Sequence, residues 1–381
     1  MRFSFLLFSF INIIYSIQFI YSFKLNNTFY HGSQIQILSI VKTNNPDDSF
    51  LSYIASAGEN GIIKLWDLTN GRLKYTNTDQ FGWIRLMTSF ENGYLASESW
   101  QGIKIFDIMN NKLKFTFDQS NGGHFGFIRA LASLENNYLA SAGAESDKKL
   151  KIWDVQNGKL LFTFDQSNGG HSDMVNRLEL LENGYLASGS DDSTIKIWDI
   201  KIGKLKFTFD QSNGGHSSSI ESLASLENGY LASGSYDGVI KIWDIINGKL
   251  KYTFDSSNGG HYDRVEILAS LEDGLLASAS YYFDGVIKIW DCTNGELKFT
   301  FDELNDGHTK RINSFASLKN GYLASASYQE IKIWDLINGK LKYTINPTNG
   351  GHTDWVSSLV LLENGYLASG SLDKTVKIWD I

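Results

Sequence analysis

Cysteine and proline are nearly absent from this chain of 381 residues. Cys292 is the only cysteine, and Pro46 and Pro347 are the only prolines. A single cysteine excludes an intrachain disulfide framework and a metal site built from several thiolates. The sequence also has 35 glycines. Many glycines with few prolines are typical of tight turns between strands rather than of linkers or disordered tails.

The chain also lacks the positive charge that attracts a nucleic acid. Its formal net charge is −8, and the sequence has no run of Lys or Arg. Because phosphate backbones bind proteins largely through basic side chains, we expect no nucleic acid partner. With 42% hydrophobic and 20% charged residues, the composition is that of a globular protein.

The first 22 residues form a long apolar stretch after a positive start at Arg2. Three interpretations stay open for residues 1–22: a secretory signal peptide, a membrane anchor, or a start codon assigned too far upstream. The stretch is barely long enough for an anchor and contains Asn12 and Gln18. We expect a secreted or membrane-associated protein if this segment is real, with the membrane reached only through it, and a cytoplasmic protein otherwise.

A repeated unit fills the rest of the chain. Each unit contains an aromatic residue followed by aspartate, and this pair recurs every 40 to 47 residues. The pairs are Trp66-Asp67, Phe106-Asp107, Trp153-Asp154, Trp198-Asp199, Trp243-Asp244, Trp290-Asp291, Trp334-Asp335 and Trp379-Asp380. They mark eight units, and a period of this length is typical of propellers and other repeat architectures.

Each unit contains four short segments with the pattern of β-strands, because apolar and polar residues alternate at period two. In the fourth unit the expected strands are 175–181, 185–190, 194–198 and 204–209. Asn-Gly, for example at residues 157–158, joins the third and fourth strands of several units. Since Asn-Gly tolerates the positive φ angles of a two-residue hairpin, the sequence predicts such hairpins there.

Four short strands cannot bury both faces of a sheet, but eight such sheets packed radially around a channel can. The sequence therefore predicts an all-β fold, an eight-bladed β-propeller of four-stranded antiparallel blades, over residues 23–381. The chain ends at Ile381, directly after the third strand of the last unit. We expect residues 22–30 to supply the missing fourth strand, so that an N-terminal strand closes the ring. The propeller itself is expected to be monomeric.

The recurring Gly-His, Asp and Trp-Asp resemble the repeats of the WD-repeat propeller family over about residues 23–381. The resemblance implies a structural tetrad: a His before the first strand, a Ser in the second, an Asp in the next turn and the Trp of the third. In the fifth unit these are His216, Ser233, Asp237 and Trp243. An ionised Asp that accepts from imidazole, with Ser linking imidazole to the indole N–H, would satisfy polar groups inside the blade.

Four further units carry a complete set of tetrad residues. The sets are His124, Ser141, Asp147, Trp153; His171, Ser188, Asp192, Trp198; His261, Ser278, Asp284, Trp290; and His352, Ser369, Asp373, Trp379. The first unit has His31, Ser56 and Trp66 but Asn60 in place of Asp, so we expect a neutral and weaker bond to its histidine.

Two other units depart from the pattern. The seventh has His308, Ser325 and Trp334, with a shortened turn that carries Gln329. The second has Gln80 for His, Gln101 near the Asp position and Phe106 for Trp. We expect blade 2 to be the softest of the eight.

No group of residues points to catalysis. All seven histidines occupy tetrad positions, so none is left to activate a serine or to bind a metal. The Ser-Asn-Gly-Gly loops lack the Lys-Ser/Thr and the helix of a phosphate-binding loop, and we interpret them as connectors. The acidic segment 302–306 lacks the ligand spacing of a calcium loop. We expect no catalytic residue, metal or cofactor, and no enzyme activity.

Binding residues are expected where the units differ. In a propeller, the connections into the first strands and the turns between second and third strands gather on one face, and the family resemblance implies that this face docks peptides. Aromatic residues and arginine recur there and are enriched in binding surfaces. The candidates are Trp83, Trp100, Phe127, Tyr236, Arg264, Phe283, Arg311, Tyr328 and Trp355. The alternative is that these side chains only pack against adjacent loops.

The sequence thus favours a protein-interaction scaffold or adaptor that presents one propeller face to partner peptides or proteins. The alternative is a secreted or membrane-tethered propeller that binds an extracellular protein or a glycan. This alternative rests on residues 1–22 and on an N-glycosylation sequon that begins at Asn26.

Overall fold

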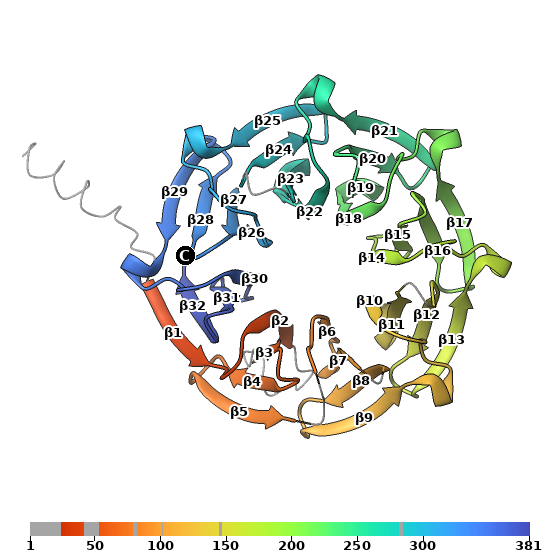
Figure 1. Ribbon diagram of the computed structural model, residues 1–381, viewed down its shortest axis with the longest axis horizontal. Coiled ribbons are helices and arrows are strands. Elements are labelled where there is room, and N and C mark those ends of the chain that lie inside the picture. Colours follow the sequence, from red (N-terminus) through yellow and green to blue (C-terminus); the bar gives the residue numbers. More distant parts are fainter. Residues whose placement is uncertain (1–23, 42–52, 79–81, 101, 145–146, 282–284) are drawn as a thin grey trace, which may run out of the picture.

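The computed structural model describes residues 24–41, 53–78, 82–100, 102–144, 147–281 and 285–381. Within these ranges the strands pair into eight four-stranded antiparallel sheets, arranged as blades around a common axis (Figure 1). The expected all-β, eight-bladed propeller is confirmed. The first strand of each blade lies nearest the axis, and the fourth forms the outer edge (Figure 1).

Blades 1 to 4 follow one another along the chain. Blade 1 consists of β2 (Ile35–Val41), β3 (Tyr53–Gly58), β4 (Ile63–Asp67) and β5 (Arg72–Asn77). Blade 2 consists of β6 (Met87–Ser89), β7 (Tyr94–Ser99), β8 (Gly102–Asp107) and β9 (Lys112–Phe117). Blade 3 consists of β10 (Ile128–Leu134), β11 (Tyr138–Gly143), β12 (Leu150–Asp154) and β13 (Lys159–Phe164). Blade 4 consists of β14 (Val175–Leu180), β15 (Leu186–Ser190), β16 (Ile195–Asp199) and β17 (Lys204–Phe209).

Blades 5 to 8 complete the ring. Blade 5 consists of β18 (Ile220–Leu226), β19 (Tyr230–Ser235), β20 (Ile240–Asp244) and β21 (Lys249–Phe254). Blade 6 consists of β22 (Val265–Ser270), β23 (Leu275–Ser280), β24 (Ile287–Asp291) and β25 (Glu296–Phe301). Blade 7 consists of β26 (Ser314–Leu318), β27 (Tyr322–Ala326), β28 (Ile331–Asp335) and β29 (Lys340–Ile345). Blade 8 consists of β30 (Val356–Leu361), β31 (Leu367–Ser371), β32 (Thr375–Asp380) and β1 (Lys24–Tyr30).

The two ends of the chain close the ring. Strand β1 pairs antiparallel with β32, with Leu25 opposite Trp379 and Tyr30 opposite Thr375. The prediction that an N-terminal strand completes the last blade is confirmed. The four strands expected for the fourth unit also agree with β14 to β17, whose ends differ by one residue at most.

The turn between the third and fourth strands is longer than expected. In blade 3, Asp154 pairs with Lys159, so four residues connect β12 to β13. Gly158 has a φ of 68°, whereas Asn157 is not among the residues with positive φ. The Asp154 carboxylate instead accepts the backbone N–H of Asn157 at 3.0 Å and its side-chain amide at 2.7 Å. The predicted two-residue hairpin is wrong, because the aspartate of the Trp-Asp pair closes a four-residue turn with its own side chain.

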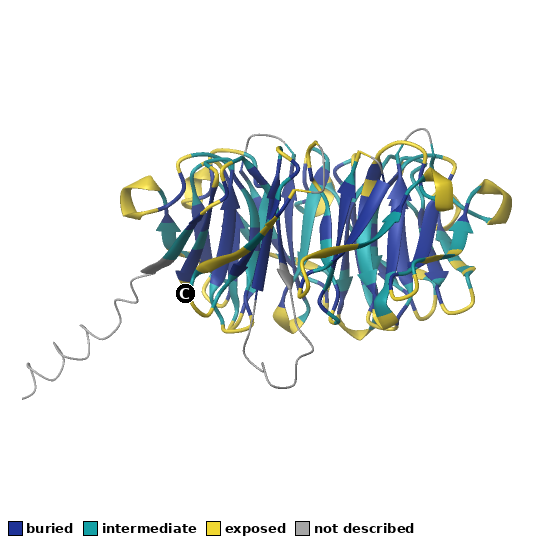
Figure 2. Ribbon diagram, turned by 90° about the horizontal axis from the view of Figure 1, so that it is seen from below, coloured by how far each residue is buried: buried dark blue, intermediate teal, exposed yellow. Residues whose placement is uncertain are grey.

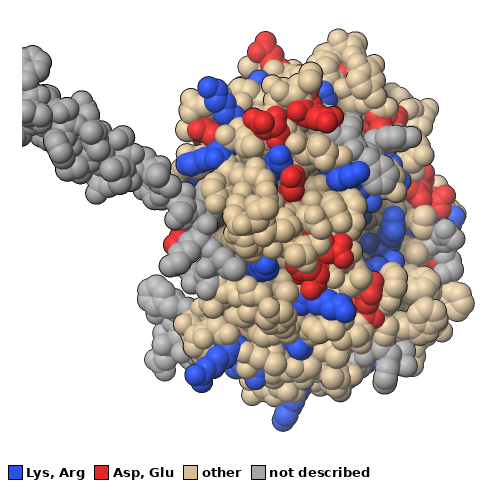
Figure 3. Space-filling view, turned by 60° about the vertical axis from the view of Figure 1, so that its left-hand side comes forward, with Lys and Arg blue, Asp and Glu red and all other residues tan. Residues whose placement is uncertain are grey.

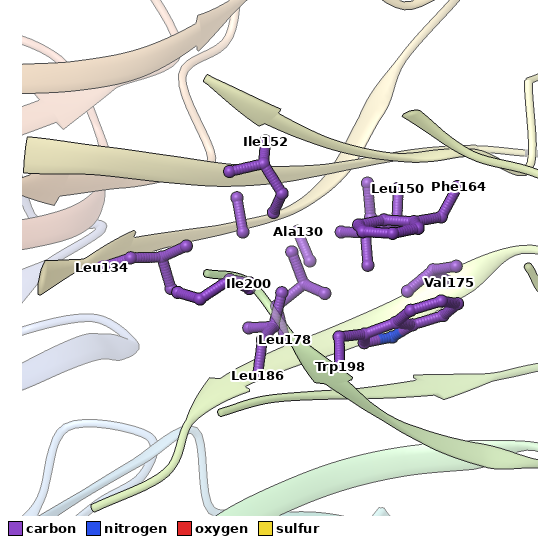
Figure 4. Close-up of a cluster of buried hydrophobic side chains, with 12 residues drawn as sticks. Ala130, Leu134, Leu150, Ile152, Phe164, Val175, Leu178, Leu186, Trp198 and Ile200 are labelled. Atoms are coloured by element: carbon purple, nitrogen blue, oxygen red, sulfur yellow. The ribbon is translucent and has the colours of Figure 1, made fainter. Parts of the chain in front are cut away.

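Blades pack on one another through stacked aromatic rings. The last residue of a fourth strand lies on the Trp of the next blade, as Phe164 does on Trp198 with ring centroids 4.3 Å apart (Figure 4). Trp198 is completely buried, and aromatic burial of this kind dominates the energy of a core. Phe29 of β1 makes the same contact with Trp66 at 4.9 Å, so the closing strand is also packed against blade 1.

Short 3₁₀ helices lie in many of the connections. Those that follow fourth strands are η1 (Gln119–Asn121), η3 (Gln166–Asn168), η4 (Gln211–Asn213), η6 (Ser256–Asn258), η8 (Glu303–Asn305) and η9 (Pro347–Asn349). Those between first and second strands are η2 (Glu135–Asn137), η5 (Glu227–Gly229) and η7 (Glu272–Gly274). At η4, Asp210 accepts the N–H of Ser212 at 2.9 Å, and the Asn213 side chain accepts the N–H of Asp210 at 3.0 Å. A Cβ at Gly215 would lie 2.4 Å from the Asp210 backbone, so this connector requires glycine.

The two faces of the disc are built from different connections. On the face that we call the upper face lie the connections into the first strands and the turns between second and third strands. The turns between first and second strands and between third and fourth strands form the lower face. The strands are mostly buried or half-buried, and exposed residues concentrate in the turns (Figure 2). Basic and acidic side chains are interspersed over the part of the surface seen in Figure 3.

Candidate functional site

Blade 5 shows how the tetrad satisfies its polar groups. Trp243 Nε1 donates to Ser233 Oγ over 2.8 Å, and the same oxygen lies 2.8 Å from His216 Nε2. The Asp237 carboxylate accepts the backbone N–H of Ser217 at 3.0 Å. However, its Oδ1 lies 3.6 Å from His216 Nδ1, which has no hydrogen-bond partner among the described residues. The expected chain of bonds from Asp to Trp is therefore interrupted at this one link.

The link is complete in three other blades. In blade 8, His352 Nδ1 lies 2.8 Å from Asp373 Oδ2, and His352 Nε2 lies 2.7 Å from Ser369 Oγ. The serine also accepts the indole N–H of Trp379 at 2.8 Å. The other pairs with this contact are His124 with Asp147 in blade 3 and His171 with Asp192 in blade 4. In these blades the tetrad implied by the family resemblance is fully formed.

The tetrad holds a neutral imidazole beside an ionised carboxylate. Burial lowers the pKa of His352, although the hydrogen bond and charge of Asp373 oppose this. Burial of Asp373 raises its pKa, but hydrogen bonds from His352, Thr375 and the N–H of Thr353 outweigh burial and hold the pKa well below its usual range. All seven histidines have lowered pKa values, with burial as the largest cause. Such histidines serve the fold rather than proton transfer.

Blade 1 departs from the expected contact. Asn60 Oδ1 accepts the N–H of Ile62 at 3.1 Å and closes its own turn. His31 contacts Ser56 Oγ through Nδ1 at 2.8 Å, and its Nε2 has no hydrogen-bond partner in the part of the chain that the structure describes. The predicted bond between Asn60 and His31 is therefore wrong, because the amide oxygen of Asn60 accepts a hydrogen bond within its own turn.

In blade 7 the shortened turn brings a different residue to the histidine. Glu330 Oε2 lies 3.3 Å from His308 Nδ1 and takes the place of the tetrad Asp. Gln329, which the sequence suggested for this turn, donates its side-chain amide to the carbonyl of Thr353 in blade 8 at 2.7 Å. The longer side chain of glutamate spans the distance that the shorter turn leaves.

Several positions named from the sequence lie outside the described residues. They are Gln80 and Gln101 of the second unit, Phe283 and Asp284 of the sixth, and the segment 1–22 with its three interpretations.

The upper face carries a repeated backbone hydrogen bond that lies within a single blade. In five blades of the described ranges, the residue after the second strand donates its N–H to the carbonyl of the residue three positions after the tetrad histidine. In blade 5, Tyr236 donates to Ser219 in this way at 2.9 Å. In blade 5 the side chain of this turn residue, Tyr236, also reaches Arg264 of blade 6. The Tyr236 ring lies 5.7 Å from the guanidinium carbon of Arg264.

Aromatic or arginine side chains form such pairs at three further boundaries. Trp100 of blade 2 packs edge-on against Phe127 of blade 3, with ring centroids 5.2 Å apart. Tyr328 of blade 7 packs against Trp355 of blade 8 at the same distance. The guanidinium group of Arg311 in blade 7 lies over the ring of Tyr281 in blade 6. The structure thus places the described candidate residues other than Trp83 in pairs across blade boundaries.

Sequence reasoning missed the tyrosine that pairs with Arg311. It is Tyr281, whose ring lies 4.5 Å from the Arg311 guanidinium carbon. Phe283 was predicted by counting back from the Asp of a longer turn. Counting forward from Ser280, at the end of β23, identifies Tyr281 as the equivalent of Tyr236.

Arg264 and Arg311 share a second partner that the sequence did not indicate. Glu266 Oε1 accepts from Arg264 Nη2 at 3.0 Å, and its Oε2 accepts from Arg311. The guanidinium carbon of Arg264 also lies 3.5 Å from the centroid of the Tyr281 ring. The single carboxylate of Glu266 therefore forms ion pairs with two guanidinium groups on this part of the upper face.

Six segments of the chain match a known family. The family model described as "WD domain, G-beta repeat" matches residues 23–67, 112–154, 158–199, 203–244, 295–335 and 339–380, which together exceed half of the chain. The chain belongs to the WD-repeat family. Among solved structures it is similar to the computationally designed Ika8 protein, with 27% identity, a TM-score of 0.74, and coverage of 92% of this chain and 98% of that one. No curated protein matches the chain.

The WD-repeat match omits residues 245–294, which contain most of blade 6, and residues 68–111, which contain most of blade 2. Phe106 replaces the tetrad Trp there, and Asn77 stands where the fourth strands of blades 2 to 7 end in Phe or Ile. The first strand of this blade, β6, has only three residues. Blade 2 thus departs from the WD-repeat pattern in its tetrad, in its boundary with blade 1 and in its inner strand.

The structure adds two findings on metals and membranes. Among the described residues, no group of three or more His, Cys, Asp or Glu could hold a metal ion. No helix in the described ranges is long and apolar enough to cross a membrane.

Burial raises the pKa of Cys292 to about 12, so this residue is a protonated thiol at neutral pH.

Proposed function

We propose that this WD-repeat propeller is a non-catalytic interaction scaffold whose upper face binds segments of partner proteins. The observation that carries the proposal is that several aromatic members of the boundary pairs stay exposed although they are paired. Trp100 is 75% exposed, and Phe127 and Tyr236 are each 55% exposed. Large aromatic side chains that lose water on binding are the usual anchors of protein interfaces. WD-repeat propellers generally bind other proteins, which supports the same proposal.

Packing against a neighbouring loop does not account for these side chains. Although they are paired, Trp100, Phe127 and Tyr236 keep more than half of their surface exposed. An exposed turn of this kind does not need a large aromatic residue in order to close. The equivalent turns of blades 4 and 8 contain Asp191 and Leu372.

Comparative capture of partners from the native cell tests the proposal. The baits are the wild-type propeller, an upper-face variant with Trp100→Ser and Trp355→Ser, and a matched lower-face variant with Ile246→Ser and Ile337→Ser. These isoleucines are 66% and 72% exposed. We expect proteins that are retained by the wild type and the lower-face variant and lost by the upper-face variant. Partners lost only with the lower-face variant would contradict the proposal.

The apolar sequence of residues 1–22 and the sequon at Asn26 support a second version, in which the partner is an extracellular protein or a glycan. N-terminal sequencing and enzymatic deglycosylation of the protein from its native cell test this version. A chain that begins near residue 23 and loses mass on deglycosylation supports it. An unglycosylated chain recovered from cytosol contradicts it.

A further inference from the structure

A cavity lies on the upper face at the boundary between blades 2 and 3. It has a volume of about 400 Å³, and its lining includes Trp83, Arg85, Glu98, Trp100 and Phe127. Trp83 and Trp100 are 62% and 75% exposed. This volume is sufficient for ligand side chains, and an apolar lining with a few polar groups is typical of binding sites.

Glu98 distinguishes this boundary from the others. The equivalent positions in the second strands of the other blades hold only Gly or Ala. They are Ala57, Ala142, Gly189, Gly234, Ala279, Ala326 and Gly370. A Cβ at Gly189 would lie 2.5 Å from Ile220 of the next blade, so a larger side chain does not fit there. The boundary between blades 2 and 3 accepts a glutamate, and the cavity lies beside it.

Glu98 holds Arg85 at the cavity. Its Oε1 accepts the backbone N–H of Arg85 at 2.9 Å and the Nε–H at 3.0 Å. The Glu98 side chain is 5% exposed and that of Arg85 is 48% exposed. Within the described residues, the two terminal amino groups of Arg85 make no hydrogen bond. The guanidinium therefore neutralises the buried carboxylate and keeps its outer N–H groups for a ligand that accepts hydrogen bonds.

We propose that this cavity binds a partner segment in which an aromatic or large aliphatic side chain stands next to an Asp or Glu. The rings of Trp83, Trp100 and Phe127 would remove the apolar side chain from water. Arg85 would pair with the neighbouring carboxylate. The inference rests on the proposed function, because it specifies the partner chemistry for the same face.

The distribution of arginine supports an acidic ligand. The chain contains seven arginines, and five of them lie at or just before the start of a first strand, on the upper face. These are Arg85, Arg129, Arg177, Arg264 and Arg311. Glu98 and Glu266 pair with three of these arginines, and Glu221 lies near Arg177 and Arg264. Arg85 is the arginine that lines the cavity, and its outer N–H groups favour a carboxylate over a cation as the ligand.

Selection from a random peptide library displayed on phage tests the proposal without assuming a partner. The target is the full-length wild-type propeller. We expect the selected peptides to share an aromatic or large aliphatic residue adjacent to Asp or Glu. A consensus rich in Lys or Arg, or the recovery of no binding peptide, would overturn the proposal.

Titration of one selected peptide then locates the site. Trp100→Ala should weaken binding at least about tenfold, whereas Ile337→Ala, at a lower-face residue that is 72% exposed, should leave the affinity unchanged. Replacing the acidic residue of the peptide by its amide should also weaken binding about tenfold to the wild type. The same replacement should have little effect on the Arg85→Gln variant. Because the amide replacement is made in the peptide, its effect on binding to the wild type does not depend on how well a variant folds.

The outcomes separate this inference from the proposed function. Binding that is lost with Trp355→Ala and kept with Trp100→Ala overturns the cavity as the site but leaves the upper face as the docking surface. Binding that neither variant affects argues against both. Titration with chitooligosaccharides, followed by fluorescence of the exposed Trp83 and Trp100, is the glycan control. Quenching by the sugar together with an absence of peptide binding overturns the peptide proposal.

Discussion

Asp237 and Asp373 occupy the same place in blades 5 and 8, but only Asp373 is hydrogen-bonded to its histidine. Hydrogen bonds to charged groups stabilise a fold by about 1.5–3 kcal/mol. Both Asp→Asn changes remove the charge from bonds with backbone N–H groups, but only Asp373→Asn also weakens a hydrogen bond to the tetrad histidine. We therefore expect Asp373→Asn to lower the free energy of unfolding by about 1–2 kcal/mol more than Asp237→Asn, as measured by denaturant titration. Equal losses would show that the contact in blade 5 closes in solution.

His31 gives the fold a dependence on pH. Burial lowers its pKa to about 4 from the ordinary 6.5, so the unfolded chain takes up the proton more readily than the folded one. The stability contributed by its neutral form is present above pH 6.5 and is lost as the pH falls toward 4. Between pH 7 and pH 5 this loss amounts to about 2 kcal/mol. In His31→Gln the decline of unfolding free energy over this interval should be smaller by that amount, and an unchanged decline would refute the assignment.

At the residue scale the sequence predicted residue types better than contacts. Strand register places the tetrad Ser and Trp, so their hydrogen bond follows from the repeat. The contact between Asp and His depends instead on the conformation and length of a turn. Glu330 takes the Asp position in a shortened turn, and Tyr281 was missed because the turn of blade 6 is longer. Counting along a repeat fails where loop length changes.

Among the structural elements, blade 2 has the weakest set of internal contacts. Phe106 has no indole N–H to donate, the inner strand β6 has three residues, and Asn77 replaces the aromatic residue at the boundary with blade 1. Segments with fewer buried contacts open at a lower free energy. We expect the amides of β7 and β8 to exchange with deuterium at least about tenfold faster than those of β19 and β20 in blade 5. Equal protection of the two blades would show that the WD-repeat tetrad contributes little to local stability.

The sequence predicted the strands correctly where apolar and polar residues alternate strongly. The strands of blade 4 and the closing strand β1 were predicted, because alternation and the missing fourth strand leave few alternatives. The turn after β12 was not, because propensity alone favours a two-residue Asn-Gly hairpin. The hydrogen bonds from Asn157 to Asp154 decide that turn, and they depend on side-chain geometry.

For the whole molecule, closure of the ring fixes the geometry of the proposed docking face. A closed ring of eight blades fixes the turns that carry the boundary pairs, so the exposed aromatic residues are held in place before a partner arrives. The lower face also exposes apolar side chains, namely Ile202, Ile246 and Ile337. The two faces are therefore the competing docking surfaces, and their residues lie far enough apart along each blade to be tested separately.

Amide hydrogen exchange of the propeller, with and without a partner recovered by the wild-type bait, tests the docking face most directly. If partners dock on the upper face, its segments become protected on binding, for example residues 98–100, 125–129 and 353–356. Little change is then expected in the lower-face turns at 200–203 and 245–248. Protection confined to those lower-face turns would contradict docking on the upper face.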